Sequence, residues 1–288
     1  MLPIPSMPIP RYRRPFMRPQ WRSWKAQSIS EEHKALLMDI STEKKASDSR
    51  AAKEVHLTPD TRCRASYLGV MAYEHALKLQ ESLLLARAEG TVPDVLLLLQ
   101  HPPVFTVGRF RGEEDIVVPT EILTREGIAV FHTNRGGGVT YHGPGQLVCY
   151  PVLRLKEHSL GVREYIWKLE AVIIQLLFAL GIRGYRVVDY PGVWVDGGKI
   201  CSVGIRVSRG ITSHGFALNV NTDLRHFEYI NPCGLSGNVM TSVSKVLGYP
   251  MEAEALIGPL LDSFSAIFGL EIEQGDSGCL AMLDGLSG

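Results

Sequence analysis

The sequence predicts an α+β fold in which a mixed, mostly antiparallel sheet is flanked by helices. The predicted strands come as hairpins and isolated runs, and single helices are interspersed among them. A chain built from repeated βαβ units would alternate strands and helices regularly, which this one does not. The order of elements therefore favours an antiparallel or mixed sheet over a parallel one.

The first predicted helix covers residues 70–89, where apolar side chains recur at helical spacing and Gly90 provides the stop. The apolar run at 94–100 lies between Pro93 and a His-Pro-Pro break, which is typical of a buried strand. Further strands are expected at residues 104–108, 127–133 and 147–153.

In the second half of the chain, a long helix is expected over 162–180, with Gly181 as its C-cap. The turn residues Asp196-Gly197-Gly198 predict a hairpin between strands at 193–195 and 199–207. A turn at Arg209-Gly210 leads into a strand at 211–220, and a last helix is expected over 253–268.

Residues 1–61 differ in composition from the rest of the chain. Six prolines between Pro3 and Pro19 prevent a continuous helix, and residues 28–60 are polar with few aromatics. We expect a disordered extension over 1–61, a catalytic domain over 62–275 and a C-terminal tail over 276–288. The extension is open to three interpretations: an organellar targeting sequence, a basic arm for an anionic partner, or a segment without function. A transit peptide is expected to form an amphipathic helix, which the prolines would interrupt. We therefore expect a cytoplasmic protein, with a mitochondrial or plastid matrix as the alternative.

Charge and cysteine content exclude several classes of protein. Lys+Arg and Asp+Glu both number 30, so the overall charge gives no sign of nucleic-acid binding. No apolar run approaches the roughly 20 residues of a membrane helix. The five cysteines contain no C-x-x-C pair, and their odd number fits no closed disulfide framework. A reducing compartment is therefore expected.

The segment at residues 135–146, Arg-Gly-Gly-Gly-Val-Thr-Tyr-His-Gly-Pro-Gly-Gln, is called the glycine loop below. Its five glycines would be costly inside regular structure and are expected where the backbone approaches a ligand closely. The loop lacks the phosphate-binding glycine motifs that lead into a helix, and a predicted strand follows it instead. We therefore expect backbone that lies against an acyl chain rather than a pyrophosphate.

A second unusual segment, Asn231-Pro232-Cys233-Gly234-Leu235, places one thiol on a predicted tight turn. Such a turn can aim the sulfur and nearby backbone N–H groups at one point. A thiol attacks a carbonyl only as the thiolate, so Cys233 needs a cation or base beside it. A small, buried, unreactive cysteine is the alternative interpretation.

Lys199 is the candidate activator, because it opens a strand that soon turns apolar. If Lys199 points inward, burial lowers its pKa and makes it a usable base, and its ammonium form can stabilise a thiolate. The alternative interpretation is that its side chain extends to solvent. His142 and His214 are alternative bases. A zinc site also stays open, although the spacing of its ligands matches no familiar pattern: His132, His142, Cys149, His214 and Cys233.

These motifs resemble those of the octanoyltransferases of lipoate biosynthesis. The order and spacing of the matching motifs fit over residues 63–275, whereas 1–61 lie outside the resemblance. The matching motifs are Arg135-Gly136-Gly137, Thr140 through Gln146, Gly192-Val193-Trp194-Val195, Lys199-Ile200, Gly204-Ile205-Arg206, His214 through Val220 and Asn231-Pro232-Cys233-Gly234. The resemblance implies a fold similar to the catalytic domain of biotin and lipoate protein ligases.

The resemblance also implies an activity. The enzyme would be an acyltransferase that moves an octanoyl group from octanoyl-acyl carrier protein to a lysine of lipoyl domains, the first step of protein lipoylation. Cys233 would carry the octanoyl group as a thioester, and Lys199 would complete a Cys/Lys dyad. Contacts with the acyl chain are implied for Arg135, Gly136, Gly137, Gly138, Val139, Thr140, Tyr141, His142, Ser202, Val203, Gly204, Gly215, Phe216 and Ala217.

The implied partners are octanoyl-acyl carrier protein and the lipoyl domains of 2-oxoacid dehydrogenase complexes and of the glycine cleavage H protein. No cofactor is implied, neither ATP nor a metal, and we expect a monomer that binds no nucleic acid or membrane. A basic rim is expected to receive the acidic carrier protein, formed by Arg163, Arg206, Arg209 and Arg225. The rival functions are an ATP-dependent lipoate ligase on the same fold, an inactive carrier-protein-binding module and a thioesterase that uses the same cysteine.

Overall fold

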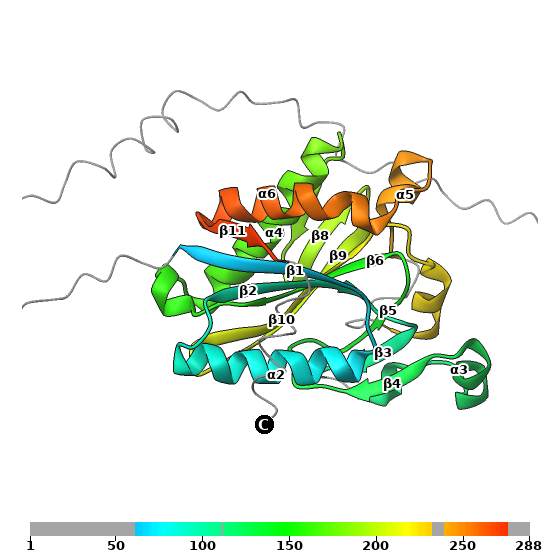
Figure 1. Cartoon of the computed structure of the whole chain (residues 1–288). Helices are drawn as coiled ribbons and strands as arrows, with labels where there is room; N and C mark the ends of the chain where they lie inside the picture. The colour runs from blue at the N-terminus through cyan, green and yellow to red at the C-terminus, as the bar shows by residue number, and fades with distance from the viewer. Residues whose placement is uncertain (1–60, 111, 232–238, 276–288) are drawn as a thin grey trace, which may run out of the picture. The chain divides into compact units, whose positions relative to one another are not determined.

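The computed structural model describes residues 61–110, 112–231 and 239–275 (Figure 1). Cys233, the C-terminal tail and all of the predicted N-terminal extension except Thr61 lie outside these residues. Eight strands form the main sheet, in the order β11-β1-β2-β6-β10-β9-β8-β7. β1 pairs in parallel with β2 and β11, and the other neighbouring pairs are antiparallel. The prediction of a mixed, mostly antiparallel sheet is therefore confirmed. The strands are β1 (Arg62–Val70), β2 (Asp94–Gln100), β6 (Gln146–Val152), β7 (Tyr185–Val187), β8 (Tyr190–Val195), β9 (Gly198–Ser208), β10 (Ile211–Asn219) and β11 (Glu271–Gln274).

Helices cover both faces of this sheet. In Figure 1, α2 (Tyr73–Glu89) lies below the sheet, and α4 (Val162–Ala179) and α6 (Ile257–Phe268) lie above it. Side chains of a strand alternate between faces, so β2 supplies both layers of core although it is apolar throughout. Leu96 and Leu98 pack with α4 and α6, while Leu97 and Leu99 pack with α2. Among the described residues, no helix combines the length and apolar character needed to cross a membrane.

A second, three-stranded sheet carries the glycine loop. Its order is β4 (Ala129–His132), β3 (Val104–Val107) and β5 (Val139–His142), and β5 is part of the loop itself. A small core lies beneath this sheet and includes Phe105 and Phe227. The remaining short elements are α3 (Thr120–Glu126), α5 (Val243–Leu247) and the 3₁₀ turns η3 (Glu113–Asp115), η4 (Leu155–His158), η5 (Leu224–Tyr229) and η8 (Ala253–Leu256).

Both predicted hairpin turns are confirmed. Asp196 and Gly197 connect β8 to β9 with φ of 48° and 83°, and Arg209 and Gly210 connect β9 to β10 with φ of 53° and 79°. Two consecutive residues of positive φ are typical of the two-residue turn whose twist matches that of the flanking strands. These turns fix the register of β8, β9 and β10, from which much of the candidate site is built.

Candidate active site

A cavity of about 590 Å³ lies among the glycine loop, β9, β10, the first turns of α4 and the start of β8. Lys199 lines this cavity. So do the predicted acyl-contact residues, with one exception: Arg135, Gly136, Gly137, Gly138, Val139, Thr140, His142, Ser202, Val203, Gly204, Gly215, Phe216 and Ala217. The structure thus gathers residues from three distant parts of the chain around one space.

Tyr141 is the exception. Strand alternation in β5 turns its side chain away from the cavity and into the small core, where it is 1% exposed. Its ring meets those of Phe105 and Phe227 edge-on, with centroids 5.8 and 5.5 Å apart. The structure therefore gives Tyr141 a packing contact that anchors the loop, in place of a position on the cavity wall.

Glycines of the loop, and two glycines that face it from other segments, allow backbone to pack on backbone. The N–H of Gly136 donates to the carbonyl oxygen of Ile205 on β9, at 2.9 Å. A Cβ added at Gly204 would lie 3.1 Å from the oxygen of Gly136, and one added at Gly108 would lie 2.3 Å from the oxygen of Gly137. These glycines are needed to seat the loop on the rest of the fold, which is a reason beyond the close approach of a ligand.

Arg135 fastens the loop to β3. The side chain is 7% exposed, and its Nε and Nη2 donate to Thr106 Oγ1 at 3.1 and 2.8 Å. Nη2 also donates to the carbonyl oxygen of Thr106 at 2.5 Å, and Nη1 to that of Gly136 at 2.9 Å. The guanidinium therefore holds the loop in place while it forms part of the cavity wall.

The two candidate histidine bases are both buried, and burial disfavours their protonated forms. Burial lowers the pKa of His142 well below its usual value, and burial followed by Arg135 lowers the pKa of His214 to about 3. His142 Nδ1 donates to Gln146 Oε1 at 2.7 Å, and His214 Nε2 donates to Asn134 Oδ1 at 2.9 Å. Groups of such low pKa are weak bases at neutral pH. They fit a role in holding the cavity wall better than proton abstraction.

Several aromatic residues of the same region were not predicted from the sequence, among them Tyr73, His101 and Tyr150. Tyr73 and Tyr150 line the cavity, and the Tyr150 hydroxyl donates to His101 Nε2 at 2.8 Å. His101 Nδ1 in turn donates to the carbonyl oxygen of Met71 at 2.7 Å, and burial lowers the pKa of His101 to about 4. The available signal was the His-Pro-Pro break directly after β2, where a polar ring follows a buried strand.

Lys199 points inward and is only 7% exposed. It lies opposite Trp194 on β8, and its Nζ is 5.8 Å from the centroid of the Trp194 ring. Gly192 makes room for its side chain, because a Cβ there would lie 2.7 Å from Lys199 Cε. Of the two interpretations of Lys199 from sequence, the buried lysine agrees with the structure.

Cys233 falls in the segment 232–238, outside the described residues, but the residues on either side are placed. Asn231 donates its N–H to the carbonyl oxygen of Asp115 at 2.8 Å. Val239 and Met240 line the cavity, and Met240 forms a β-bridge with Lys199. The chain thus resumes on the cavity wall beside Lys199.

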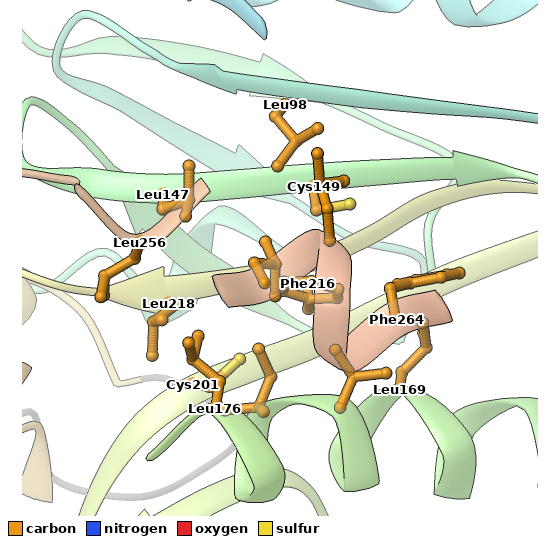
Figure 2. Packing of buried hydrophobic residues seen from close by; sticks show 14 of the residues in the cluster. Leu98, Leu147, Cys149, Leu169, Leu176, Cys201, Phe216, Leu218, Leu256 and Phe264 are labelled. Carbon is orange, nitrogen blue, oxygen red and sulfur yellow. The ribbon is translucent and has the colours of Figure 1, made fainter. Parts of the chain in front are cut away.

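The three cysteines that the structure describes, Cys63, Cys149 and Cys201, lie in the core between the sheet and α4 and α6. Figure 2 shows Cys149 and Cys201 among leucine and phenylalanine side chains. Burial raises the pKa of all three thiols. Buried thiols of raised pKa are poor nucleophiles, so these three do not compete with Cys233 for the role.

The described members of the hypothetical zinc site do not come together. Cys149 belongs to the core on the α4 face, whereas His132 is mostly exposed and bonds to Glu113 Oε1 at 2.7 Å. Within the described ranges, no group of three or more His, Cys, Asp or Glu side chains is placed to hold a metal ion.

The burial of the core thiols gives a testable result. We expect Cys63, Cys149 and Cys201 to stay unmodified when the native protein is treated with iodoacetamide at neutral pH, because their thiolates are destabilised by burial. Peptide mass spectrometry measures the modification. The same treatment in guanidinium chloride is the control and should modify all three, while rapid labelling of Cys201 in the native protein would contradict its assigned environment.

The predicted basic rim is only partly beside the cavity. Arg163 follows the lining residue Val162 and is exposed, and Arg206 follows the lining residue Ile205. Arg209 is exposed in the β9–β10 turn. Arg225 is occupied by Asp223, with Nη2 and Oδ2 2.5 Å apart, and its hydrogen bond lowers the pKa of Asp223 to about 2.

Known proteins are similar to this chain in sequence or in fold. The family model described as the lipoyl protein ligase A/B catalytic domain matches residues 72–265. An octanoyltransferase from Desulforamulus reducens is 45% identical over 207 residues, which cover 72% of this chain and 91% of that protein. An octanoyltransferase from Caldicellulosiruptor saccharolyticus is 46% identical over 205 residues, covering 70% and 87%.

Among solved structures, lipoate-protein ligase A bound with ATP matches with a TM-score of 0.62 and 16% identity, over 77% of this chain and 94% of that one. A putative lipoate protein ligase from T. acidophilum with bound lipoic acid matches with a TM-score of 0.60 and 16% identity, over 78% and 95%. At these identities the likeness concerns the fold.

Proposed function

This chain belongs to the lipoyl protein ligase A/B catalytic family and, within it, to the octanoyltransferases, and from that premise we propose that it transfers the octanoyl group through a thioester on Cys233, with Lys199 as the partner base. The activity is octanoyl transfer for protein lipoylation. The roles of the two residues and the identity of the two protein substrates are the proposal.

One observation carries the proposal: a buried lysine lies on the wall of a cavity with mainly apolar sides. Val203, Phe216 and Ala217 give the cavity surfaces suited to a fatty chain, and a volume of about 590 Å³ falls within the range of small-molecule sites. Chain connectivity supports Cys233 as the nucleophile. It is two residues from Asn231 and six from Val239, which lines the cavity.

In the first half-reaction, the Cys233 thiolate attacks the thioester carbonyl of octanoyl-acyl carrier protein. The carbon–sulfur bond to the carrier's phosphopantetheine breaks, and the departing thiolate takes a proton from the Lys199 ammonium. The products are the octanoyl-enzyme, the carrier thiol and neutral Lys199. A lysine held in a desolvated site is suited to cycle between the two protonation states.

In the second half-reaction, the neutral ε-amine of a lipoyl-domain lysine attacks the thioester on Cys233. Neutral Lys199 accepts the proton that the amine loses, as a general base, and the Cys233 thiolate leaves. An amide has replaced the thioester, and the thiolate and ammonium are restored. The two substrates bind in turn, so ping-pong kinetics are expected.

The proposal includes no ATP and no metal, because each step starts from a thioester that is already activated. The partners are octanoyl-acyl carrier protein and the lipoyl domains of 2-oxoacid dehydrogenase complexes and of the glycine cleavage H protein. Arg163, Arg206 and Arg209 are the candidate contacts for the acidic carrier protein, whereas Arg225 is committed to Asp223.

ATP dependence separates the proposed transferase from the rival ligase. The purified protein is incubated with octanoyl-acyl carrier protein and an unmodified lipoyl domain, without ATP or magnesium, and the lipoyl domain is weighed by intact-protein mass spectrometry. We expect one octanoyl group per domain. Product formed only from free octanoate and ATP would support the ligase, and rapid octanoate release without the lipoyl domain would support a thioesterase.

A further inference from the structure

Glu170 is a buried carboxylate that the reaction above does not use. It lies in α4, is 7% exposed and is not among the residues that line the cavity. Burial of a carboxylate is costly unless it is paired and hydrogen-bonded. Both oxygens are occupied: Oε2 accepts from Arg186 Nε at 2.9 Å, and Oε1 accepts from the backbone N–H of Gly192, also at 2.9 Å.

The bond to Gly192 links Glu170 to the candidate base. Gly192 has a φ of 133°, and the register of β8 against β9 shifts between the next two residues, Val193 and Trp194. A Cβ on Gly192 would lie only 2.7 Å from Lys199 Cε. The Gly192 backbone is therefore the surface on which the Lys199 side chain rests, and Glu170 holds that surface from behind.

The electrostatics around Cys201 also indicate that Glu170 and Lys199 lie close together. Burial is the main cause that raises the pKa of the Cys201 thiol, but the charge of Lys199 opposes this rise and the charge of Glu170 adds to it. Lys199 and Glu170 are therefore both close enough to act on one buried sulfur. Arg186 contributes from β7 and is itself fixed, since its guanidinium lies 4.2 Å from the Trp167 ring centroid and Nη2 donates to the Trp167 carbonyl oxygen at 2.9 Å.

We propose that Glu170 is a positioning residue for Lys199: its carboxylate fixes the Gly192 backbone so that the lysine side chain has one path and its Nζ one place in the cavity. The proposal rests on the base role of Lys199 proposed above. Displacement of a reacting group by about 1 Å can cost about 100-fold in rate. A fixed support for a flexible four-carbon side chain therefore has a direct kinetic consequence.

The test begins with two substitutions of graded severity. Glu170→Gln keeps one oxygen that can accept from Gly192, whereas Glu170→Ala keeps none. We expect kcat to fall about tenfold in the first variant and about 100-fold in the second, with KM for octanoyl-acyl carrier protein unchanged. If Glu170→Ala does not fold, the glutamine variant still carries the test. Unchanged kcat in a folded Glu170→Gln variant would overturn the proposal.

A double-substitution cycle with Lys199→Ala separates positioning from a general structural effect. The rate of the second half-reaction is measured for the two single variants and for Glu170→Gln/Lys199→Ala. If Glu170 acts through Lys199, its substitution has no further effect once the lysine is gone. Equal slowing in both backgrounds would overturn the proposal while leaving the role of Lys199 intact. A wild-type rate for Lys199→Ala alone would instead remove the proposed function on which the inference rests.

Glu157→Gln is the matched control. Glu157 also pairs with arginines, Arg87 and Arg154, but lies outside the cavity lining. We expect its kcat to match the wild type even if the melting temperature falls. A kcat loss in this control equal to that of Glu170→Gln would show that removal of any paired carboxylate slows the enzyme, and the proposal would fail.

Discussion

Octanoyl transfer is expected to cease when Cys233 is replaced by alanine. Cys233 is the one sulfur proposed to form the covalent bond, because Cys63, Cys149 and Cys201 are buried and their thiol pKa values are raised. Loss of a nucleophile that acts together with its base costs on the order of 10⁶-fold in kcat in a well-studied hydrolase. We expect a comparable loss here, measured as the rate at which the lipoyl domain gains octanoyl groups.

The matched control for this variant is Cys63→Ala. Cys63 is a buried cysteine of β1 that does not line the cavity, so its substitution is expected to lower stability without removing activity. Circular dichroism checks that both variants keep the fold. Transfer at a substantial fraction of the wild-type rate in folded Cys233→Ala would contradict the assignment of the nucleophile.

The second large effect is expected at Lys199. Lys199→Ala should slow both half-reactions by about 10²- to 10⁴-fold, the usual contribution of a general acid–base group. The two steps are affected together because one amine donates the proton in the first and accepts it in the second. Rapid-quench measurement of octanoyl-enzyme formation and of its consumption by the lipoyl domain gives the two rates separately.

Lys199→Arg distinguishes a base from a fixed charge. Arginine stays protonated, so it can stabilise a thiolate but cannot accept a proton from the attacking amine. We therefore expect octanoyl-enzyme formation to recover in part and the second half-reaction to stay slow. Lys168→Ala is the control, since Lys168 lies on α4 over the Phe268 ring and outside the cavity lining. A wild-type rate in both steps for Lys199→Ala would remove this residue from the mechanism.

The parts of the fold that local sequence determines were predictable. Asp196-Gly197 and Arg209-Gly210 supply two residues of positive φ each, so both hairpins follow from composition alone. Strand β11 was not predicted, because Glu271 and Glu273 leave it without an apolar alternation and it exists only through its parallel pairing with β1. The first predicted helix was drawn too early for the same reason: residues up to Val70 pair with β2 and belong to β1.

In the site, too, the features set by local sequence were predictable and those set by contacts between distant segments were not. The glycine loop and Lys199 stand out as residue patterns, and the structure gathers them around one cavity. Tyr141 falls within that pattern, but strand alternation directs it into the small core. Glu170 does not stand out in the sequence, because α4 contains a second carboxylate, Glu164. Its partners, Arg186 and Gly192, are 16 and 22 residues further along the chain, so its place beside Lys199 follows only from the folded arrangement.

The covalent intermediate is the central claim, and peptide mapping tests it most directly. The protein is incubated with octanoyl-acyl carrier protein alone and digested with trypsin without added thiols, which would cleave a thioester. The peptides are then analysed by mass spectrometry. Cleavage after Arg225 and Lys245 isolates Cys233 from Cys201, which lies on the peptide between Lys199 and Arg206. We predict one octanoyl group on the peptide 226–245, lost when a lipoyl domain is added before digestion. An octanoyl group on the Cys201 peptide, or transfer without any octanoyl-enzyme, would contradict the account.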